Sequence, residues 1–255
     1  MLFLVACEKK ADWEITPETD NRIVVEGMIT NEQKAHYVKL SLPFQALNQE
    51  PQTVSGAIVK ISTDSVEWLL HETPAGSGIY LTDSNVQGVA GEHYYLSAKW
   101  QGRTITATAI MSPVTRLIPF RYIKSDNNQN LYKISWVCPV YNPDDAAMFS
   151  LDYDLQGSSV THVQSWYYML STLDPGQILP PLQETIEFPA GTVIKERKYS
   201  LSDDHQKFLR ELLLETRWRG GMFDMAAANV YTNLNGDAVG YFAACAVLEC
   251  TTTIQ

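Results

Sequence analysis

A cysteine near the start of the chain stands where a chemical modification is expected. Cys7 follows the apolar run Met1–Ala6 and precedes the charged stretch Glu8–Asp12. In Leu4-Val5-Ala6-Cys7, an aliphatic side chain lies three residues before the thiol and a small one directly before it. This pattern is typical of bacterial lipoproteins, in which a signal peptidase cuts beside a thiol that carries diacylglycerol. We expect Cys7 to be lipidated and to become the mature N-terminus.

The apolar run is shorter than the roughly 7–15 residues of a complete export signal. We therefore interpret residues 1–21 as a truncated lipoprotein signal followed by a polar tether. The alternative is an ordinary buried N-terminal strand.

Aromatic side chains gather at one place in the second half of the chain. Trp166 and Tyr168 would share one face of a strand and Tyr167 the other, and a proline-rich loop follows with Pro175, Pro180 and Pro181. Trp and Tyr offer large rigid surfaces with a polar end, which suits contact with a protein, a peptide or a sugar ring. We predict that these six residues contact a ligand or partner. The alternative is a strand that is buried on both faces.

Catalytic and metal-binding patterns were sought by residue type and spacing. The sequence contains no HExxH, CxxC, GxSxG or GxxxxGK[ST] pattern. Its five histidines are scattered singly. The spacing that begins at Asp126 resembles the start of a calcium-binding loop, but Leu131 and Val137 stand where such a loop requires Gly and Glu. The pairs Asp144-Asp145 and Asp152/Asp154 could serve acid–base chemistry, but solvated turns and strand edges explain them as well. We expect no enzyme activity, no metal and no cofactor.

Three further cysteines could form a disulfide in an exported protein. Cys245 and Cys250 are five residues apart in an expected strand and would face opposite sides. We therefore predict that Cys138 pairs with Cys250.

Charge and hydropathy indicate which partners the chain can have. The formal net charge is −10 and no run of Lys or Arg exceeds two, so nucleic acid is not an expected partner. Beyond Cys7 no uncharged apolar segment reaches the roughly 18–20 residues that span a bilayer. Membrane attachment is therefore expected through the lipid on Cys7, where two acyl chains suffice for stable anchoring.

The elements that position these residues are mainly β-strands. Alternating patterns predict strands at 22–30, 35–42, 57–62, 66–71, 78–82, 93–100 and 103–111, with a tight hairpin at Gln101-Gly102. Seven short strands in about ninety residues are typical of a small antiparallel sandwich. We predict an immunoglobulin-like or transthyretin-like β-sandwich domain over 22–112.

The second half combines strands with a helix. Alternation predicts strands near 115–124, 131–138, 146–155, 160–170, 192–199 and 239–248. Leu201, His205, Phe208, Leu209, Leu212 and Leu213 follow helical spacing, and Ser200 or Ser202 can cap the start. We predict an α+β domain over 113–255, with an antiparallel sheet and an amphipathic helix near 201–217 that packs on it.

An ordered set of segments resembles a lipoprotein family of Bacteroidota known as domain of unknown function four-two-four-nine. The N-terminal half of the resemblance rests on 22–31, 38–40, 56–59, 78–80 and 91–96, and its closing part on 221–224, 229–234 and 240–244. The resemblance implies an outer-membrane lipoprotein at the cell surface, often encoded beside a TonB-dependent transporter. It implies no established activity and no catalytic residues.

Together these observations favour a non-enzymatic outer-membrane lipoprotein that serves as an accessory binding component of TonB-dependent nutrient uptake. Its expected partners are the membrane, a transporter, and a peptide or glycan ligand. The alternative location is the periplasmic face of the outer membrane. The second hypothesis is a structural or adhesive surface protein without a small ligand, and the third is a glycan or peptide hydrolase.

Overall fold

A computed structural model describes residues 21–44, 50–139, 145–155, 162–171, 185–217 and 230–255. Lipidation of Cys7 and the contacts predicted for Pro175, Pro180 and Pro181 concern residues outside these ranges. The predicted strand content is confirmed, because the described chain is mainly β with a single described helix.

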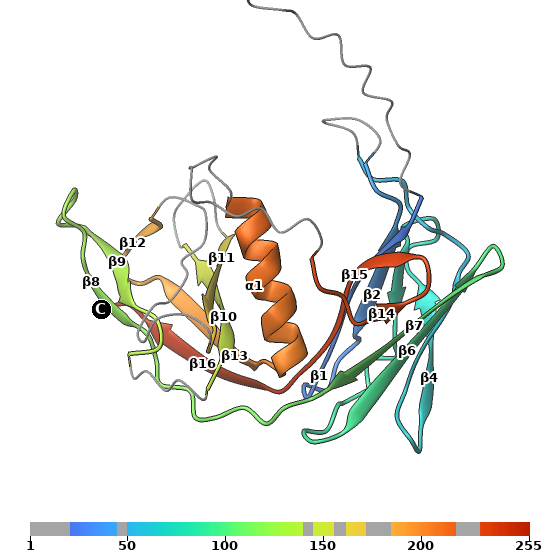
Figure 1. The fold of residues 1–255 in the computed structure, drawn as a ribbon. Helices are drawn as coiled ribbons and strands as arrows, with labels where there is room; N and C mark the ends of the chain where they lie inside the picture. The colour runs from blue at the N-terminus through green and yellow to red at the C-terminus, as the bar shows by residue number, and fades with distance from the viewer. Residues whose placement is uncertain (1–20, 45–49, 140–144, 156–161, 172–184, 218–229) are drawn as a thin grey trace, which may run out of the picture.

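The largest element is a nine-stranded sheet that curls into a nearly closed barrel (Figure 1). Its strand order is β14-β7-β6-β3-β4-β5-β2-β1-β15. The strands are β1 (Ile23–Thr30), β2 (Tyr37–Ser41), β3 (Ile58–Ser62), β4 (Glu67–Glu72), β5 (Ile79–Leu81), β6 (His93–Trp100), β7 (Arg103–Ile110), β14 (Leu234–Asn235) and β15 (Ala238–Cys245).

Alternation along each strand builds the barrel interior. In β7, Ile105, Ala107 and Ala109 are buried while the residues between them are exposed. The β6–β7 hairpin turns at Gln101 and Gly102, which both have positive φ angles (46° and 77°). This is the backbone that a two-residue hairpin loop prefers, so the predicted turn is confirmed.

The barrel closes through contacts between the two ends of the chain. β15 pairs in parallel with β1, and the Asn233 side chain bridges the remaining gap by donating to the Thr108 and Phe242 carbonyls at 3.0 and 2.8 Å. Gly240 has φ +103°, and a Cβ atom there would lie 2.1 Å from the Val25 carbonyl oxygen. A side chain at this position would therefore push β15 away from β1.

This closure differs from the predicted two-sheet sandwich, and the expected boundary near residue 113 does not separate the sheets. β14 and β15 come from the C-terminal end of the chain yet complete the first sheet. Periodicity indicates strands but not which distant strands pair, so the pairing of β14 and β15 with strands of the first sheet was not predicted.

The rest of the described chain forms two smaller antiparallel sheets. One has the order β11-β10-β13-β16 and the other β12-β9-β8. Their strands are β8 (Arg121–Lys124), β9 (Leu131–Trp136), β10 (Ala147–Asp154), β11 (His162–Met169), β12 (Glu187–Pro189), β13 (Val193–Ser200) and β16 (Val247–Thr253). Phe149, Leu151, Tyr153 and Phe188 belong to the buried cluster of these sheets.

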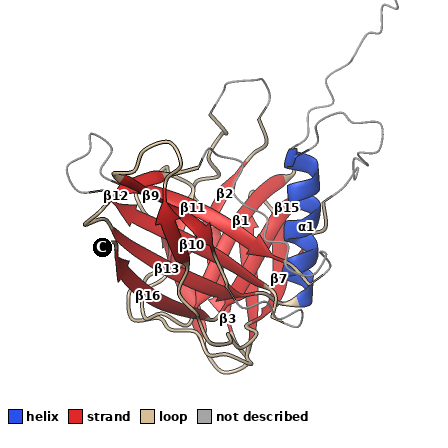
Figure 2. Ribbon diagram, turned by 90° about the vertical axis from the view of Figure 1, so that its left-hand side faces the viewer, coloured by secondary structure: helices blue, strands red, loops and turns tan. Residues whose placement is uncertain are grey.

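Helix α1 (Asp203–Arg217) lies between the four-stranded sheet and the barrel (Figure 1), along one edge of the strands in Figure 2. The Ser202 hydroxyl accepts a hydrogen bond from the His205 backbone N–H at 3.3 Å, so Ser202 is the N-cap. Leu209 is buried in a cluster that includes Tyr199 of the four-stranded sheet and Tyr241 of the barrel. The predicted packing on the sheet is thus correct but incomplete, because α1 also covers β15.

One residue of the predicted apolar stripe, Leu212, does not belong to the buried face of the helix. Leu212 is 36% exposed, whereas His205 and Leu209 are 4% and 6% exposed. The buried face of α1 is narrower than the sequence pattern indicates.

The predicted disulfide between Cys138 and Cys250 is not formed in the structure. Cys138 Sγ lies 3.8 Å from the Met169 sulfur of β11, at one edge of the four-stranded sheet, while Cys250 belongs to β16 at the other edge. Three strand spacings of about 4.8 Å separate these edges, far beyond the reach of a disulfide.

Candidate functional site

The four-stranded sheet has two chemically different faces because side chains alternate along its strands. In β13, Ile194 belongs to the buried cluster between the two small sheets, and Glu196 is buried beside it in the strand. Lys195 and Arg197 point to the opposite face, on the same side as Tyr199. The second face is apolar beneath α1 and becomes polar toward the start of β13.

The polar part of this face forms a half-open groove of about 390 Å³. Its walls are made by seven residues from all four strands: Asp152, Asp154, His162, Val193, Lys195, Arg197 and Thr251. A groove of this size lies at the small end of the volumes typical of ligand sites.

Charges of opposite sign line the groove in neighbouring rows. β10 supplies Asp152 and Asp154, and the adjacent β13 supplies Lys195 and Arg197. Asp152 stands directly opposite Lys195 in the strand register, and Asp154 stands opposite His162 of β11. A carboxylate row therefore runs about one strand spacing, roughly 4.8 Å, from a cationic row.

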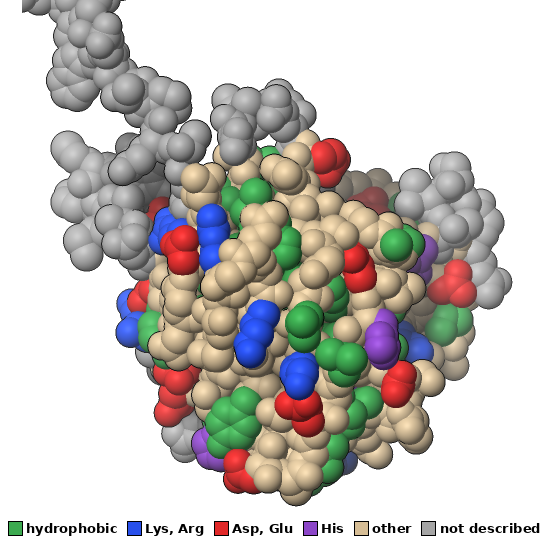
Figure 3. Space-filling view, turned by 90° about the vertical axis from the view of Figure 1, so that its right-hand side faces the viewer, with side chains coloured by type: hydrophobic (Ala, Val, Ile, Leu, Met, Phe, Trp, Pro, Cys, Tyr) green, Lys and Arg blue, Asp and Glu red, His purple; other side chains and the backbone are tan. Residues whose placement is uncertain are grey.

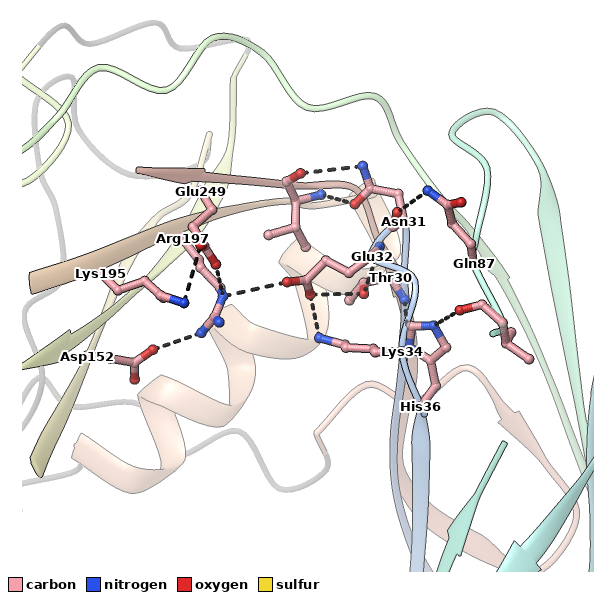
Figure 4. A network of polar contacts seen from close by, with 12 residues as sticks. Thr30, Asn31, Glu32, Lys34, His36, Gln87, Asp152, Lys195, Arg197 and Glu249 are labelled. Carbon is pink, nitrogen blue, oxygen red and sulfur yellow. Dashed lines mark hydrogen bonds and ion pairs between the residues drawn. The ribbon is translucent and has the colours of Figure 1, made fainter. Parts of the chain in front are cut away.

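Arg197 is the most highly connected member of the groove (Figure 4). Its Nη1 donates to Asp152 at 2.8 Å, and its Nε donates to Glu249 of β16 at 3.0 Å. The same Nε lies 3.6 Å from Glu32, in the turn between β1 and β2 of the barrel. Lys195 pairs only with Glu249, at 3.3 Å, among the described residues.

The barrel turn that carries Glu32 is itself fixed by polar contacts (Figure 4). The Asn31 side chain accepts from the Val247 backbone N–H at 2.6 Å and donates to its carbonyl at 3.4 Å. His36 Nδ1 accepts from the Thr30 backbone N–H at 3.3 Å, and its Nε2 lies 3.2 Å from the Val86 carbonyl oxygen. This arrangement requires the neutral imidazole with its proton on Nε2, and burial lowers the pKa of His36 accordingly.

The charge of Glu32 is stabilised by its neighbours. Burial alone would raise the pKa of Glu32, but hydrogen bonds from Lys34 and Thr30 and the charges of Lys34 and Arg197 outweigh it and lower the pKa. Glu32 therefore stays ionised and holds the groove residue Arg197 from the barrel side.

Residues 8–251 match the family described as Domain of unknown function (DUF4249). The chain belongs to this family. A comparison with curated proteins found no match. The description of the DUF4249 family names no activity.

The aromatic segment predicted as a contact surface is partly buried in the DUF4249 chain. Trp166 and Tyr168 pack against the cluster beneath α1, where the Trp166 and Tyr199 rings lie 5.7 Å apart. Tyr167 packs against the cluster between the two small sheets. All three rings keep intermediate exposure, so the contact predicted for Trp166, Tyr167 and Tyr168 stays a prediction.

Three further buried titratable groups, Glu196, His205 and Cys245, lie outside the groove. Glu196 is fully buried, its Oε2 accepts from the Phe120 backbone N–H at 3.0 Å, and its Oε1 has no hydrogen-bond partner. Burial raises the pKa of Glu196 to about 7. His205 stacks on Tyr241 at 4.9 Å with its Nδ1 3.6 Å from Cys245 Sγ, and burial raises the pKa of that thiol to about 12. A thiol with a pKa this high stays protonated and is a poor nucleophile.

The other acidic residues considered in the sequence have structural partners or lie outside the described ranges. Asp145 pairs with the buried Lys198 and with Thr115, Asp126 pairs with Lys133, and Asp144 lies outside the described ranges. No group of three or more His, Cys, Asp or Glu in the described residues could hold a metal ion. Within the same residues, no helix has the length and apolar character of a membrane span.

Most groove residues were not singled out from the sequence. Asp152 and Asp154 form the carboxylate pair and His162 is one of the isolated histidines of the sequence analysis, but Val193, Lys195, Arg197 and Thr251 were missed. The available signal was the spacing of Lys195 and Arg197, which places both on one face of a strand.

Proposed function

We propose that this DUF4249 protein is a non-enzymatic outer-membrane lipoprotein at the cell surface, where it binds a small polar nutrient for a TonB-dependent transporter. The lipid on Cys7 anchors it, and the groove on the four-stranded sheet holds the ligand. The groove is the observation that carries this proposal.

The groove suits binding because its central cation, Arg197, is already fixed before a ligand arrives. Arg197 is held by Asp152, Glu249 and Glu32, from two neighbouring strands and the barrel turn. Side chains with fixed positions lose little conformational entropy when a ligand contacts them, which favours affinity. The half-open shape leaves a path for entry and release.

The position of the tether also fits a surface receptor. The tether joins β1 at Ile23, whereas the turn with Glu32 follows the other end of that strand. A strand of eight residues spans about 26 Å. The lipid attachment therefore enters the fold at the end of β1 that is remote from the groove.

The two alternative functions predict other features. An adhesive protein needs a broad contact surface, but the barrel face in Figure 3 intersperses hydrophobic side chains with charged ones. The apolar side chains of Ile58 in β3 and Leu69 in β4 are exposed at 56% and 49%. A hydrolase needs a free acid, base or nucleophile at the ligand. Of the two groove carboxylates, Asp152 is held by Arg197 and Gln164, so a hydrolase would depend on Asp154.

A ligand panel tests the proposal. Thermal unfolding is followed with amino acids, short peptides and oligosaccharides at millimolar concentration, and at least one class should raise the Tm. Lys195→Met should abolish the rise. Lys60→Met is the matched control, because Lys60 forms a similarly exposed pair with Glu67 on the barrel. Mass spectrometry should recover the ligand unchanged.

No Tm rise with any class, or an equal rise in wild type and Lys195→Met, would contradict a binding role for the groove. Anchoring is tested separately with a complete signal restored: Cys7→Ser should lose fatty-acid labelling and membrane retention.

A further inference from the structure

The groove carries charges of both signs but no aromatic platform. Among its seven described lining residues, two are carboxylates, two are cations and none is Phe, Tyr or Trp. Sugar rings are commonly bound against aromatic side chains, which offer a flat apolar face with polar groups at the edge. The lining therefore favours a ligand that has its own charges.

The two carboxylates of the groove differ in their existing partners. Asp152 accepts hydrogen bonds from Arg197 and from Gln164, at 2.8 and 2.7 Å. Asp154 is exposed and forms no ion pair with any residue in the described ranges. Asp154 is thus the carboxylate that can accept a new cationic partner.

The two cations differ in the same way. Arg197 is bound by carboxylates from β10, β16 and the barrel turn, so it is part of the groove wall. Lys195 has one partner, Glu249, in a pair whose side chains are 42% and 39% exposed. Such exposed pairs contribute little free energy and exchange partners readily. Lys195 is the cation that can take a new anionic partner.

From these differences we infer that the groove binds a short peptide as a zwitterion, with its terminal ammonium on Asp154 and its terminal carboxylate on Lys195. This inference rests on the proposed function and names its ligand class. Asp154 is opposite Val193 in the register, two residues from Lys195. The Cα atoms of Asp154 and Lys195 are therefore about 8 Å apart, given strand spacings of about 4.8 Å and a rise of about 3.3 Å per residue.

The separation of these groups sets the ligand length. An extended peptide spans at most about 3.3–3.6 Å per residue, so two or three residues match the separation between the Cα atoms of Asp154 and Lys195. The groove volume of about 390 Å³ also suits a small ligand. His162 lies directly across from Asp154 and flanks the ammonium position.

Calorimetry with trialanine tests the inference through each charge separately. Wild type should bind trialanine, and acetylation of its amino terminus or amidation of its carboxyl terminus should each weaken binding at least tenfold. Asp154→Asn should weaken trialanine binding at least tenfold but have no further effect on the acetylated peptide. Lys195→Met should do the same for the amidated peptide, and the controls Lys60→Met and Glu67→Gln should bind like wild type.

The outcomes separate this inference from the proposed function. If maltotriose binds and Lys195→Met abolishes that binding, the groove is a ligand site but the peptide assignment is overturned. The assignment is also overturned if both blocked peptides bind as tightly as trialanine. If no ligand of the panel binds, both the assignment and the proposed function fail.

Discussion

Arg197 of β13 and Glu32 of the barrel turn are 165 positions apart in the sequence, yet the guanidinium Nε lies 3.6 Å from the carboxylate Oε1. This ion pair joins the groove residue Arg197 of the four-stranded sheet to the barrel (Figure 4). The Asn31 side chain, next in sequence to Glu32, adds two hydrogen bonds to the backbone of Val247. The groove geometry therefore depends on contacts between the barrel and the sheet.

Replacement of Arg197 by Met should destabilise the protein by about 1–3 kcal/mol. Asp152, Glu249 and Glu32 would then face one another without their shared cation. The cost is below that of a fully buried pair because these side chains retain 13–39% exposure. Urea denaturation measures it, with Lys60→Met as a surface control that should cost less than about 0.5 kcal/mol. Equal effects of the two substitutions would contradict a special role for Arg197.

Glu196→Gln should change how stability depends on pH. Because the folded-state pKa of Glu196 is raised to about 7, the folded protein holds a proton that the unfolded chain releases near pH 4.5. Wild-type stability should therefore fall by about 1.4 kcal/mol per pH unit between about pH 4.5 and 7 through this group. The stability of Glu196→Gln relative to wild type should rise across that window and level off above it. A difference that is independent of pH would show that Glu196 is ionised in the fold.

His205→Phe should show the opposite dependence. Burial lowers the pKa of His205 to about 4, whereas an unfolded histidine titrates near 6.5. Stability should be lost as pH falls from about 6.5 to 4, again by about 1.4 kcal/mol per unit through this group. Phe keeps the ring that stacks on Tyr241 and cannot take up a proton. The variant should gain stability relative to wild type as pH falls, and a flat difference would argue against a neutral buried imidazole.

Leu209→Ala and Leu212→Ala should separate the two sides of α1. Leu209 is 6% exposed, so its truncation should leave a cavity and cost about 2–4 kcal/mol. Leu212 is 36% exposed and should cost less than half as much. Chemical denaturation of both variants measures the difference. A larger loss for Leu212 would mean that the helix is rotated relative to this account.

Much of the strand arrangement could be predicted because it is local. The alternation in Arg103–Ile110 and the turn at Gln101-Gly102 are properties of neighbouring residues, and both appear in the structure. The pairing of β15 with β1 could not be predicted, because it joins segments about 215 residues apart. Asn233, which bridges that closure, looks in the sequence like an ordinary loop residue.

The candidate site was only partly foreseeable for the same reason. The sequence shows that Asp152 and Asp154 share a face of one strand and that Lys195 and Arg197 share a face of another. It does not show that these strands are neighbours or that the two faces coincide. The surroundings of the segment at Trp166 could not be predicted either, because one of its aromatic faces meets α1, whose position depends on tertiary packing.

Histidine NMR tests the central claim, that the groove is the ligand site, most directly. His162 lines the groove, whereas His36 and His205 are buried elsewhere and serve as internal controls. Titration with trialanine should shift the ring signals of His162 with saturation and leave those of His36 and His205 unchanged. If His162 stays unchanged while calorimetry detects binding, the ligand occupies another place and the account of the groove is wrong.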